Sequence, residues 1–558
     1  MKRTLDTLQY TILFFLLAIP YVMGLFVPLM DSDSAHHANI ALHMYKNNNF
    51  IDLVDKGKDY LDKPHLLFWL AGAFYYIFGV NAFAYKLPSF LMSIAAVFAT
   101  KKLGTRLYDN HTGNLAALLL ASAQAFIIAC NDVRMDAILT SCIILATWQL
   151  VEVVHNKKWY NYVGAALFLA MGFSTKGQVG IVMPAIAIFF YLLHRRDLAL
   201  IFNLRWLVVG VLLAVFMLPE LYAFYMQFDK HPEKVIRGMS NISGVKFILW
   251  GQNIERLDGT SWGGGQKDYF FYFHTLLWAF LPWSLLAYYA IGSRIKRLAQ
   301  TRLAYFKNEE GLTIGTIVLI FVLISLSRFQ LPHYLNILFP FISILTAEKL
   351  LKLSGGINNR PLKTVYFVQL IVVILLITGT LALNLWAFPV TNILVAIAGT
   401  ALFALLISII IRKEDLFVKT IMMSVVAIVL VNIMLNGNFY PKLIGYQGGS
   451  SLAKVVKEEN IPVDQIAFYN IHSFAFDFET NNLTKPVTLQ QLPERRDISW
   501  VFTNETGLDS LKRSLPPEKI YEAEQFRITM LTLPFLNPRT RQGTLSKYYL
   551  AGIKRPQP

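Results

Sequence analysis

Five short polar segments stand between the long apolar runs of this sequence and carry its candidate chemical groups. Lysine and arginine bind phosphate as a point charge or as a fork, and a carboxylate can accept the proton of an attacking hydroxyl. The set therefore suits a ligand that is a phosphate-bearing lipid. The segments are Asp31-Ser32-Asp33, Tyr60-Leu61-Asp62-Lys63-Pro64, Asn131-Asp132-Val133-Arg134-Met135-Asp136, Ser174-Thr175-Lys176-Gly177 and Ser327-Arg328-Phe329-Gln330-Leu331-Pro332-His333-Tyr334.

The composition indicates that these segments lie at a membrane. The 558 residues are 55% hydrophobic and only 15% charged, with a mean hydropathy of +0.46. Soluble globular proteins carry about 45–50% apolar and about 25% charged residues, so an ordinary soluble enzyme, a disordered chain and a coiled coil are excluded. Cys130 and Cys142 both lie in apolar runs, which argues against a disulfide framework and against a cysteine-based zinc site.

About thirteen apolar stretches are long enough to cross a bilayer, with some allowance for tilt. The first follows Lys2 and Arg3 and has no small-residue cleavage site after it, so we expect a retained span instead of a signal peptide. The stretches are 10–29, 86–105, 113–130, 137–154, 159–173, 178–194, 204–226, 269–291, 312–326, 330–350, 364–386, 390–411 and 416–436.

Basic residues orient these spans. From residue 100 onward, clusters of Lys and Arg occur at every second connection, as the positive-inside rule requires of cytoplasmic loops. The N-terminus is then cytoplasmic and the C-terminus outside, and residues 65–80 form an outer juxtamembrane or re-entrant helix, not a span. The net charge of +16 mostly records this topology, because it is spread over short loops instead of forming a nucleic-acid patch. All five polar segments fall on the outer side, where ionisable groups need partners or a polar ligand.

The predicted fold is a polytopic α-helical membrane protein with two parts. Residues 1–436 form the transmembrane domain, with long outer loops at 30–85 and 228–268. Residues 437–558 form a small α/β domain outside the membrane, with strands expected at 465–469, 499–503, 527–533 and 547–553 and helices at 450–460 and 508–515.

Each candidate residue also has a purely structural interpretation. Asp33 could cap a helix at 34–47, Asp136 could cap the fourth span, and Lys63 could extend its amine to the interface. The histidines His36, His37 and His65 lack the spacing of a zinc site, so hydrogen-bonded or surface histidines are favoured over metal ligands. All these charges converge on one face of the membrane. A purely structural role is therefore harder to accept for all of them together than for any one residue alone.

Six segments in register resemble the bacterial lipid A aminoarabinose transferase and protein O-mannosyltransferase group over about residues 1–350. The resemblance implies a GT-C glycosyltransferase, an integral membrane enzyme with an outward-facing active site and a polyprenyl- or dolichyl-phosphate-linked sugar donor. The segments begin at Asp33-Ser34-Ala35-His36-His37, Tyr60-Leu61-Asp62-Lys63-Pro64, Phe78-Gly79-Val80-Asn81, Gly172-Phe173-Ser174-Thr175-Lys176, Leu281-Pro282-Trp283 and Ser325-Leu326-Ser327-Arg328.

The resemblance also implies roles for individual residues. Asp33 matches the acidic residue that is the usual candidate for catalytic carboxylate, and Asp136 matches a second acidic position near the active site. The positions implied to bind the donor phosphate are Lys63, Lys176, Arg256, Arg328 and Tyr334.

Three departures from the group bear on specificity. The group commonly has Asp-Glu followed by Arg-Tyr where this chain has Asp33-Ser34 and His36-His37, and its Lys-Pro-Pro is Lys63-Pro64-His65 here. The His pair that helps to hold zinc in the aminoarabinose transferases is replaced by Ser261-Trp262 before Gly263-Gly264. The sequence therefore predicts no metal site and no cofactor, while a divalent metal is left open.

The leading hypothesis is transfer of a sugar, with inversion, from an undecaprenyl-phosphate donor to a lipid A-like, protein or glycan acceptor at the outer face of a bacterial inner membrane. The alternative is a transporter or flippase of lipid-linked substrates, which needs ionisable residues near the membrane midplane and broken helices. A non-enzymatic scaffold is the third interpretation, and it gives no reason for the outward cations. The sugar, the acceptor and the oligomeric state stay open.

Overall fold

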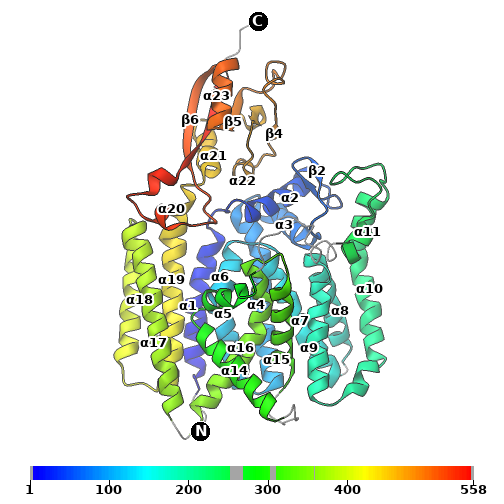
Figure 1. Ribbon diagram of the computed structural model, residues 1–558, viewed down its shortest axis with the longest axis vertical. Coiled ribbons are helices and arrows are strands. Elements are labelled where there is room, and N and C mark those ends of the chain that lie inside the picture. The colour runs from blue at the N-terminus through cyan, green and yellow to red at the C-terminus, as the bar shows by residue number, and fades with distance from the viewer. Residues whose placement is uncertain (1–3, 157, 252–267, 302–309, 357–358, 554–558) are drawn as a thin grey trace.

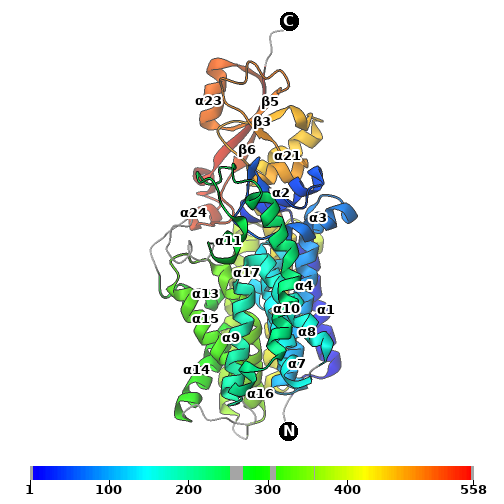
Figure 2. The same ribbon diagram turned by 90° about the vertical axis from the view of Figure 1, so that its right-hand side faces the viewer.

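A long bundle of near-parallel helices carries a small sheet domain on one end in the computed structural model, with the N-terminus at the opposite end (Figure 1). The structure describes residues 4–156, 158–251, 268–301, 310–356 and 359–553. We call the two ends of the bundle the sheet-domain end and the N-terminal end. Figure 2 shows the same division in a view turned by 90°.

Each of the thirteen predicted spans coincides with one helix of the bundle or with a broken pair. Among the described residues, seven helices are long and apolar enough to cross a membrane, or eight if the bent pair α5 and α6 is one span, so the larger count stays a prediction. The protein is a multi-pass membrane protein. The bundle helices are α1 (Thr7–Leu25), α4 (Ala82–Leu107), α5 (Asn110–Ala121), α6 (Gln124–Asn131), α7 (Met135–Asn156), α8 (Trp159–Lys176), α9 (Val179–His194), α10 (Arg205–Phe224), α13 (Phe271–Ala279), α14 (Ser284–Gln300), α15 (Leu312–Leu326), α16 (Phe339–Ser354), α17 (Arg360–Leu381), α18 (Ile393–Ile411) and α19 (Leu416–Met434).

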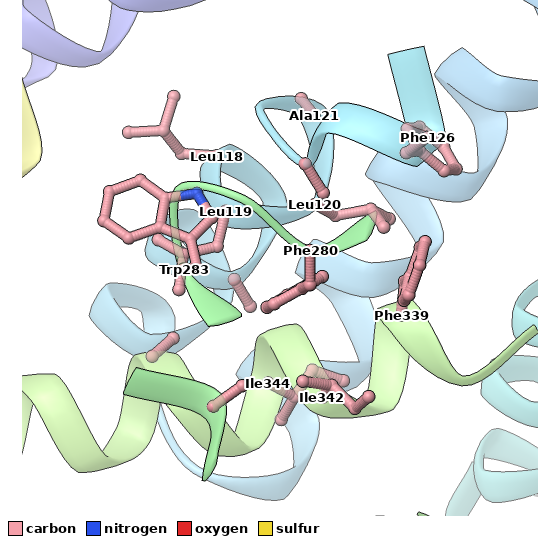
Figure 3. Close-up of a cluster of buried hydrophobic side chains, with 14 of the residues drawn as sticks. Leu118, Leu119, Leu120, Ala121, Phe126, Phe280, Trp283, Phe339, Ile342 and Ile344 are labelled. Carbon is pink, nitrogen blue, oxygen red and sulfur yellow. The ribbon is translucent and has the colours of Figure 1, made fainter. Parts of the chain in front are cut away.

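A bend of 54° separates α5 from α6 and directs the end of α6 toward the sheet-domain end. The Leu281-Pro282-Trp283 turn between α13 and α14 supports this bend. The backbone N–H of Gln124 donates to the carbonyl of Leu281 at 2.9 Å, and the Trp283 indole donates to the Ser122 hydroxyl at 2.9 Å. Figure 3 shows Trp283 and Phe280 packed against residues of α5 and α16. The turn thus satisfies polar groups that the bend would leave unpaired in an apolar core.

Two short helices lie across the sheet-domain end of the bundle. Helix α2 (Asp33–Asn47) packs against α3 (Leu66–Phe78), and both lie beneath the sheet domain (Figures 1 and 2). The small hairpin of β1 (Val54–Asp55) and β2 (Lys58–Asp59) connects them. The segment 65–80 is therefore a helix outside the bundle, as the alternation of basic and non-basic loops predicted.

The C-terminal part folds around a five-stranded mixed sheet in the order β4-β3-β5-β7-β6. Strand β3 pairs in parallel with β4 and β5, whereas β7 is antiparallel to β5 and β6. The strands are β3 (Ile466–Phe468), β4 (Lys485–Pro486), β5 (Trp500–Asn504), β6 (Pro517–Gln525) and β7 (Ser546–Ile553), and the helices are α20 (Tyr440–Ile444), α21 (Gly448–Glu458), α22 (Phe474–Thr480), α23 (Glu505–Ser514) and α24 (Leu533–Leu536).

The expected strand at 527–533 is wrong. The chain there forms turns, and the edge strand that pairs with the outer side of β7 is the more polar segment Pro517–Gln525. Ile528, in the segment that was expected to be a strand, lies outside the sheet. It packs with Phe388 and Phe535 where the C-terminal part meets the end of the α17 segment. An edge strand can be polar because only one of its faces needs apolar side chains, so its apolar signal is weak.

Candidate active site at the sheet-domain end

Ends of separate elements bring six side chains together at the sheet-domain end of the bundle. We call this group the site cluster. Asp33 is the first residue of α2, Asp136 lies in the first turn of α7, and Lys176 is the last residue of α8. Arg134 lies in the connection of α6 to α7, and His333 and Tyr334 lie in the short 3-10 helix η4 (Pro332–Leu338) before α16.

Asp136 and Lys176 form the buried part of the site cluster. The Lys176 ammonium donates to Asp136 Oδ1 at 2.8 Å, and the two side chains are only 8% and 5% exposed. His333 Nε2 lies 3.6 Å from the other Asp136 oxygen, and the Lys176 nitrogen lies 4.1 Å from the centre of the Tyr334 ring. Such a pair is costly to bury, and removing one partner leaves an uncompensated charge.

Asp33 and Arg134 form the more open part. Arg134 Nη1 lies 2.9 Å from Asp33 Oδ2, and Arg134 Nη2 donates to Asp132 Oδ2 at 3.0 Å. Arg134 Nη1 also lies 3.4 Å from His333 Nδ1, so this arginine connects both parts. The Asp33 side chain is 48% exposed. Because Ser32 is the N-cap of α2 and the Asp33 carboxylate faces Arg134, the capping interpretation of Asp33 is wrong.

A cavity of about 410 Å³ opens beside these charges. Asp132, Arg134, Asp136 and His333 lie along its wall, together with apolar residues of α6 such as Ile128. Residues of α13 and of the C-terminal part complete it, namely Trp278, Tyr440 and Thr529. The site thus combines paired charges, apolar surface and free volume, the usual mixture in a binding site for an amphipathic ligand.

The other three predicted phosphate-binding residues differ in position. Lys63 is half-buried, and its charge is close enough to act on His37 of α2. Arg328 is exposed, and among the described residues no hydrogen bond or ion pair joins it to the site cluster. Arg256 and the Ser261-Trp262-Gly263-Gly264 segment lie outside the described residues.

Sequence reasoning assigned no role to Arg134 or His333, although both stand in the polar segments that it singled out. Arg134 could have been found from the sequence, because it is a cation in a short outer connection, where the positive-inside rule leads us to expect few cations. Glu220 in α10 was also missed, and its signal was a lone carboxylate inside an apolar run. Its carboxylate accepts from the backbone N–H of His65 at 3.1 Å and lies 2.9 Å from His65 Nδ1, with both side chains fully buried. This pair fixes the segment that follows Lys63 against α10.

The sheet domain holds the segment that begins α2. The Asp31 carboxylate accepts from the Ser473 hydroxyl at 3.0 Å and from the backbone N–H of Ala475 at 2.9 Å. Asn39 donates to the carbonyl of Phe474 at 2.7 Å, and the Phe474 ring stacks on His36 with centroids 4.4 Å apart. Burial raises the pKa of Asp31 to about 6, against the lowering effect of its hydrogen bonds. Helix α22 is therefore part of the support for Asp33.

Among the described residues, no group of three or more His, Cys, Asp and Glu side chains has an arrangement that could hold a metal ion. The carboxylates of the site cluster are instead bonded to Arg134 and Lys176.

The sequence is similar to a family of mannosyltransferases and to bacterial arabinosyl transferases. Residues 62–222 match the family model described as dolichyl-phosphate-mannose-protein mannosyltransferase. The undecaprenyl phosphate-alpha-4-amino-4-deoxy-L-arabinose arabinosyl transferase 1 of Pseudomonas fluorescens is 23% identical over 62% of this chain. The corresponding transferase of Pseudomonas savastanoi is 25% identical over 61% of the chain. The matches span 59% and 60% of the length of these two relatives.

The fold extends the similarity over the whole chain. The crystal structure of ArnT from Cupriavidus metallidurans bound to undecaprenyl phosphate superposes with a TM-score of 0.74, at 16% identity, over 98% of this chain and 99% of that one. The chain therefore has the fold of this ArnT structure. The residues 62–222 that match the family model include Lys63, Arg134, Asp136 and Lys176. The family match therefore covers three of the six residues of the site cluster, Arg134, Asp136 and Lys176, and the structure adds Asp33, His333 and Tyr334 from outside the matched range.

Proposed function

We propose that this protein transfers a sugar, with inversion, from an undecaprenyl-phosphate-linked donor to a lipid or protein acceptor at the outer face of the bacterial inner membrane. The observation that carries the proposal is a cavity of about 410 Å³ whose wall includes Arg134 and Asp136, the partners of Asp33 and Lys176. Asp33, Asp136 and Lys176 come from three separate helices, and the similar proteins are named as transferases that act on undecaprenyl-phosphate-linked and dolichyl-phosphate-linked sugars.

The reaction exchanges one C–O bond for another. The acceptor oxygen attacks the anomeric carbon in line, and the bond between that carbon and the phosphate oxygen of the lipid breaks. Lys63 and Lys176 stabilise the negative charge that grows on the leaving phosphate, an effect worth about 3 kcal/mol for one well-placed donor. Asp33 takes the proton of an acceptor hydroxyl, and Arg134 orients its carboxylate through the 2.9 Å ion pair. If the acceptor atom is an anionic phosphate oxygen, no base is needed and Asp33 only positions it.

The charge pattern of the loops supports an orientation with the N-terminus in the cytoplasm and the sheet domain in the periplasm. Helix α3 lies at the same end of the bundle as the site and limits the entry of water, which would otherwise hydrolyse the donor. The expected outer loop at 228–268 falls partly outside the described residues. Asp33, Asp136 and Lys176 all stand at helix ends on one side of the bundle. A transporter of lipid-linked substrates needs such groups near the midplane, so this arrangement favours the enzyme.

The test begins with mass spectrometry of lipid A and of envelope glycoproteins from cells with and without the gene. We expect one sugar mass to disappear from one of these two classes. The same cells are complemented with Lys63→Ala and Lys176→Met proteins and with Lys58→Ala as the matched exposed control. Loss of the modification with normal membrane levels of the two site variants supports the enzyme. An unchanged set of lipid and protein masses in the deletion strain would refute the transferase.

A further inference from the structure

His37 is a buried histidine one helical turn beyond Asp33. The two residues lie four positions apart in α2, so their side chains share a face of that helix. The residue is 6% exposed, and its Nδ1 atom is buried with no hydrogen-bond partner among the described residues. Its ring contacts are aromatic: the centroid of Phe68 lies 5.8 Å away edge-on, and that of His36 lies 5.5 Å away.

Charges from three other segments act on this ring. Lys63 precedes α3, Arg134 precedes α7, and Asp136 lies in the first turn of α7. Burial lowers the pKa of His37 well below its ordinary value, and His36, Lys63 and Arg134 lower it further while Asp136 opposes them. The imidazole is therefore neutral at pH 7, with one N–H donor and one nitrogen acceptor.

A buried polar atom without a partner is unusual, because folding gives up its bond to water and returns nothing. The carboxylates around His37 are already committed, since Asp33 is bonded to Arg134 and Asp136 to Lys176. His37 Nδ1 is therefore a neutral hydrogen-bonding atom without a partner among the described residues, next to carboxylates that are already paired.

We propose that His37 is a substrate-contacting residue, whose neutral imidazole hydrogen-bonds a hydroxyl group of the transferred sugar or of the acceptor. The proposal rests on the transferase function argued above. A neutral ring suits an uncharged hydroxyl because it binds without competing with the lysines for the phosphate. A hydrogen bond to a substrate hydroxyl would also give the unpaired Nδ1 atom of His37 its partner.

The experiment uses purified full-length protein in liposomes with two donors, undecaprenyl phosphate carrying 4-amino-4-deoxy-L-arabinose or mannose. Release of undecaprenyl phosphate is measured with purified lipid A present and absent. The key variant is His37→Phe, which keeps a ring against Phe68 and loses no hydrogen bond within the protein. His37→Asn restores a polar atom near the Nδ1 position. The matched control is His43→Phe in the same helix, because His43 also has an unpaired Nδ1 atom and lies beside Asp52.

We expect His37→Phe to lower turnover at least tenfold with an unchanged or higher Tm, and His37→Asn to recover part of the loss. A loss both with and without lipid A assigns the hydroxyl to the sugar, and a loss only with lipid A assigns it to the acceptor. Turnover of His37→Phe within twofold of wild type overturns the inference alone, as does an equal loss in His43→Phe. If the wild-type protein turns over neither donor, the transferase proposal and the inference both fall.

Discussion

Two groups of buried charges, one at each end of the bundle, show what distinguishes a site from a structural network. At the N-terminal end, Arg294 Nη2 lies 3.2 Å from Glu348 Oε2 and donates to the Tyr108 hydroxyl at 3.1 Å. Tyr108 donates to Glu310 at 2.7 Å, and Glu310 accepts from the backbone N–H of Thr313 at 2.8 Å. We call Tyr108, Arg294, Glu310 and Glu348 the distal cluster.

The distal cluster is as rich in charge as the site cluster but is more enclosed. Arg294, Glu310 and Glu348 are 4%, 4% and 5% exposed, whereas the side chains of Asp33 and Arg134 are 48% and 24% exposed. The site cluster also borders a cavity of about 410 Å³. Burial of charge by itself therefore does not identify a functional site, whereas partly exposed charges beside free volume do.

The largest expected effect follows from removing the charge of Asp33. Asp33→Asn keeps the shape of the side chain but cannot accept a proton, so transfer to a hydroxyl acceptor should fall about 10²- to 10⁴-fold. Its thermal stability should stay close to wild type, because an ion pair this exposed contributes about 0–1 kcal/mol. Initial rates and Tm of the purified protein measure both. Undiminished transfer would exclude Asp33 as the base.

Matched double variants sharpen the comparison. Lys176→Met with Asp136→Asn removes both charges of the buried pair, and we expect a folded protein with turnover at least about 100-fold lower. Arg294→Met with Glu348→Gln does the same in the distal cluster and should leave turnover per folded molecule unchanged. Size-exclusion profiles and turnover rates test the pair. Equal losses of turnover in both double variants would contradict the proposal that only the site cluster takes part in the reaction.

The single variant Arg294→Met tests what the distal cluster does. It leaves the buried Glu348 with Lys352 as its remaining cation, so the free energy of unfolding should fall by about 1–3 kcal/mol, and Glu348→Gln in the same chain should recover part of that loss. Thermal unfolding in detergent gives the order of stabilities. A normal Tm with a collapse of turnover would instead make the distal cluster functional.

A smaller effect is expected at Arg328, which the sequence predicted to bind phosphate. The residue is exposed and separate from the site cluster, so Arg328→Ala should change the KM for the donor less than about tenfold, as for a single exposed charge. Lys63→Ala is the comparison within the predicted phosphate site. Equal increases in KM would bring Arg328 into that site.

The smallest effect concerns the pH dependence of the contact between Asp31 and the sheet domain. Its pKa of about 6 in the folded protein lies above the ordinary value of 3.8, so its contribution to stability is full below about pH 4 and is lost as pH rises through 6. Asp31→Asn does not titrate and can keep both hydrogen bonds. The Tm of wild type relative to this variant should therefore fall by a few degrees between pH 4 and pH 7. A constant difference would contradict the raised pKa.

Much of the architecture could be predicted from local patterns. Apolar length located the bundle helices, and the alternation of basic loops placed residues 65–80 outside the bundle, where α3 lies. Three of the four expected strands in the C-terminal part occur as β3, β5 and β7. The expected strand at 527–533 was wrong because the polar edge strand β6 lacks an apolar signature. Asp33, Asp136, Lys176 and Tyr334 were predicted together, whereas Arg134, His333 and Glu220 needed the structure to assign their contacts.

The sequence by itself determined that the chain spans a membrane and which of its loops the positive-inside rule assigns to the cytoplasmic side. It also determined which few ionisable groups depart from that rule. These properties depend on hydropathy and charge along the chain, and both are local. Only the tertiary structure decided that Arg134 joins Asp33 to His333 and that α22 supports the start of α2. It also decided that His37 Nδ1 has no hydrogen-bond partner among the described residues. Those facts depend on which helix ends meet in space and on which hydrogen bonds are already used, and residue spacing contains neither.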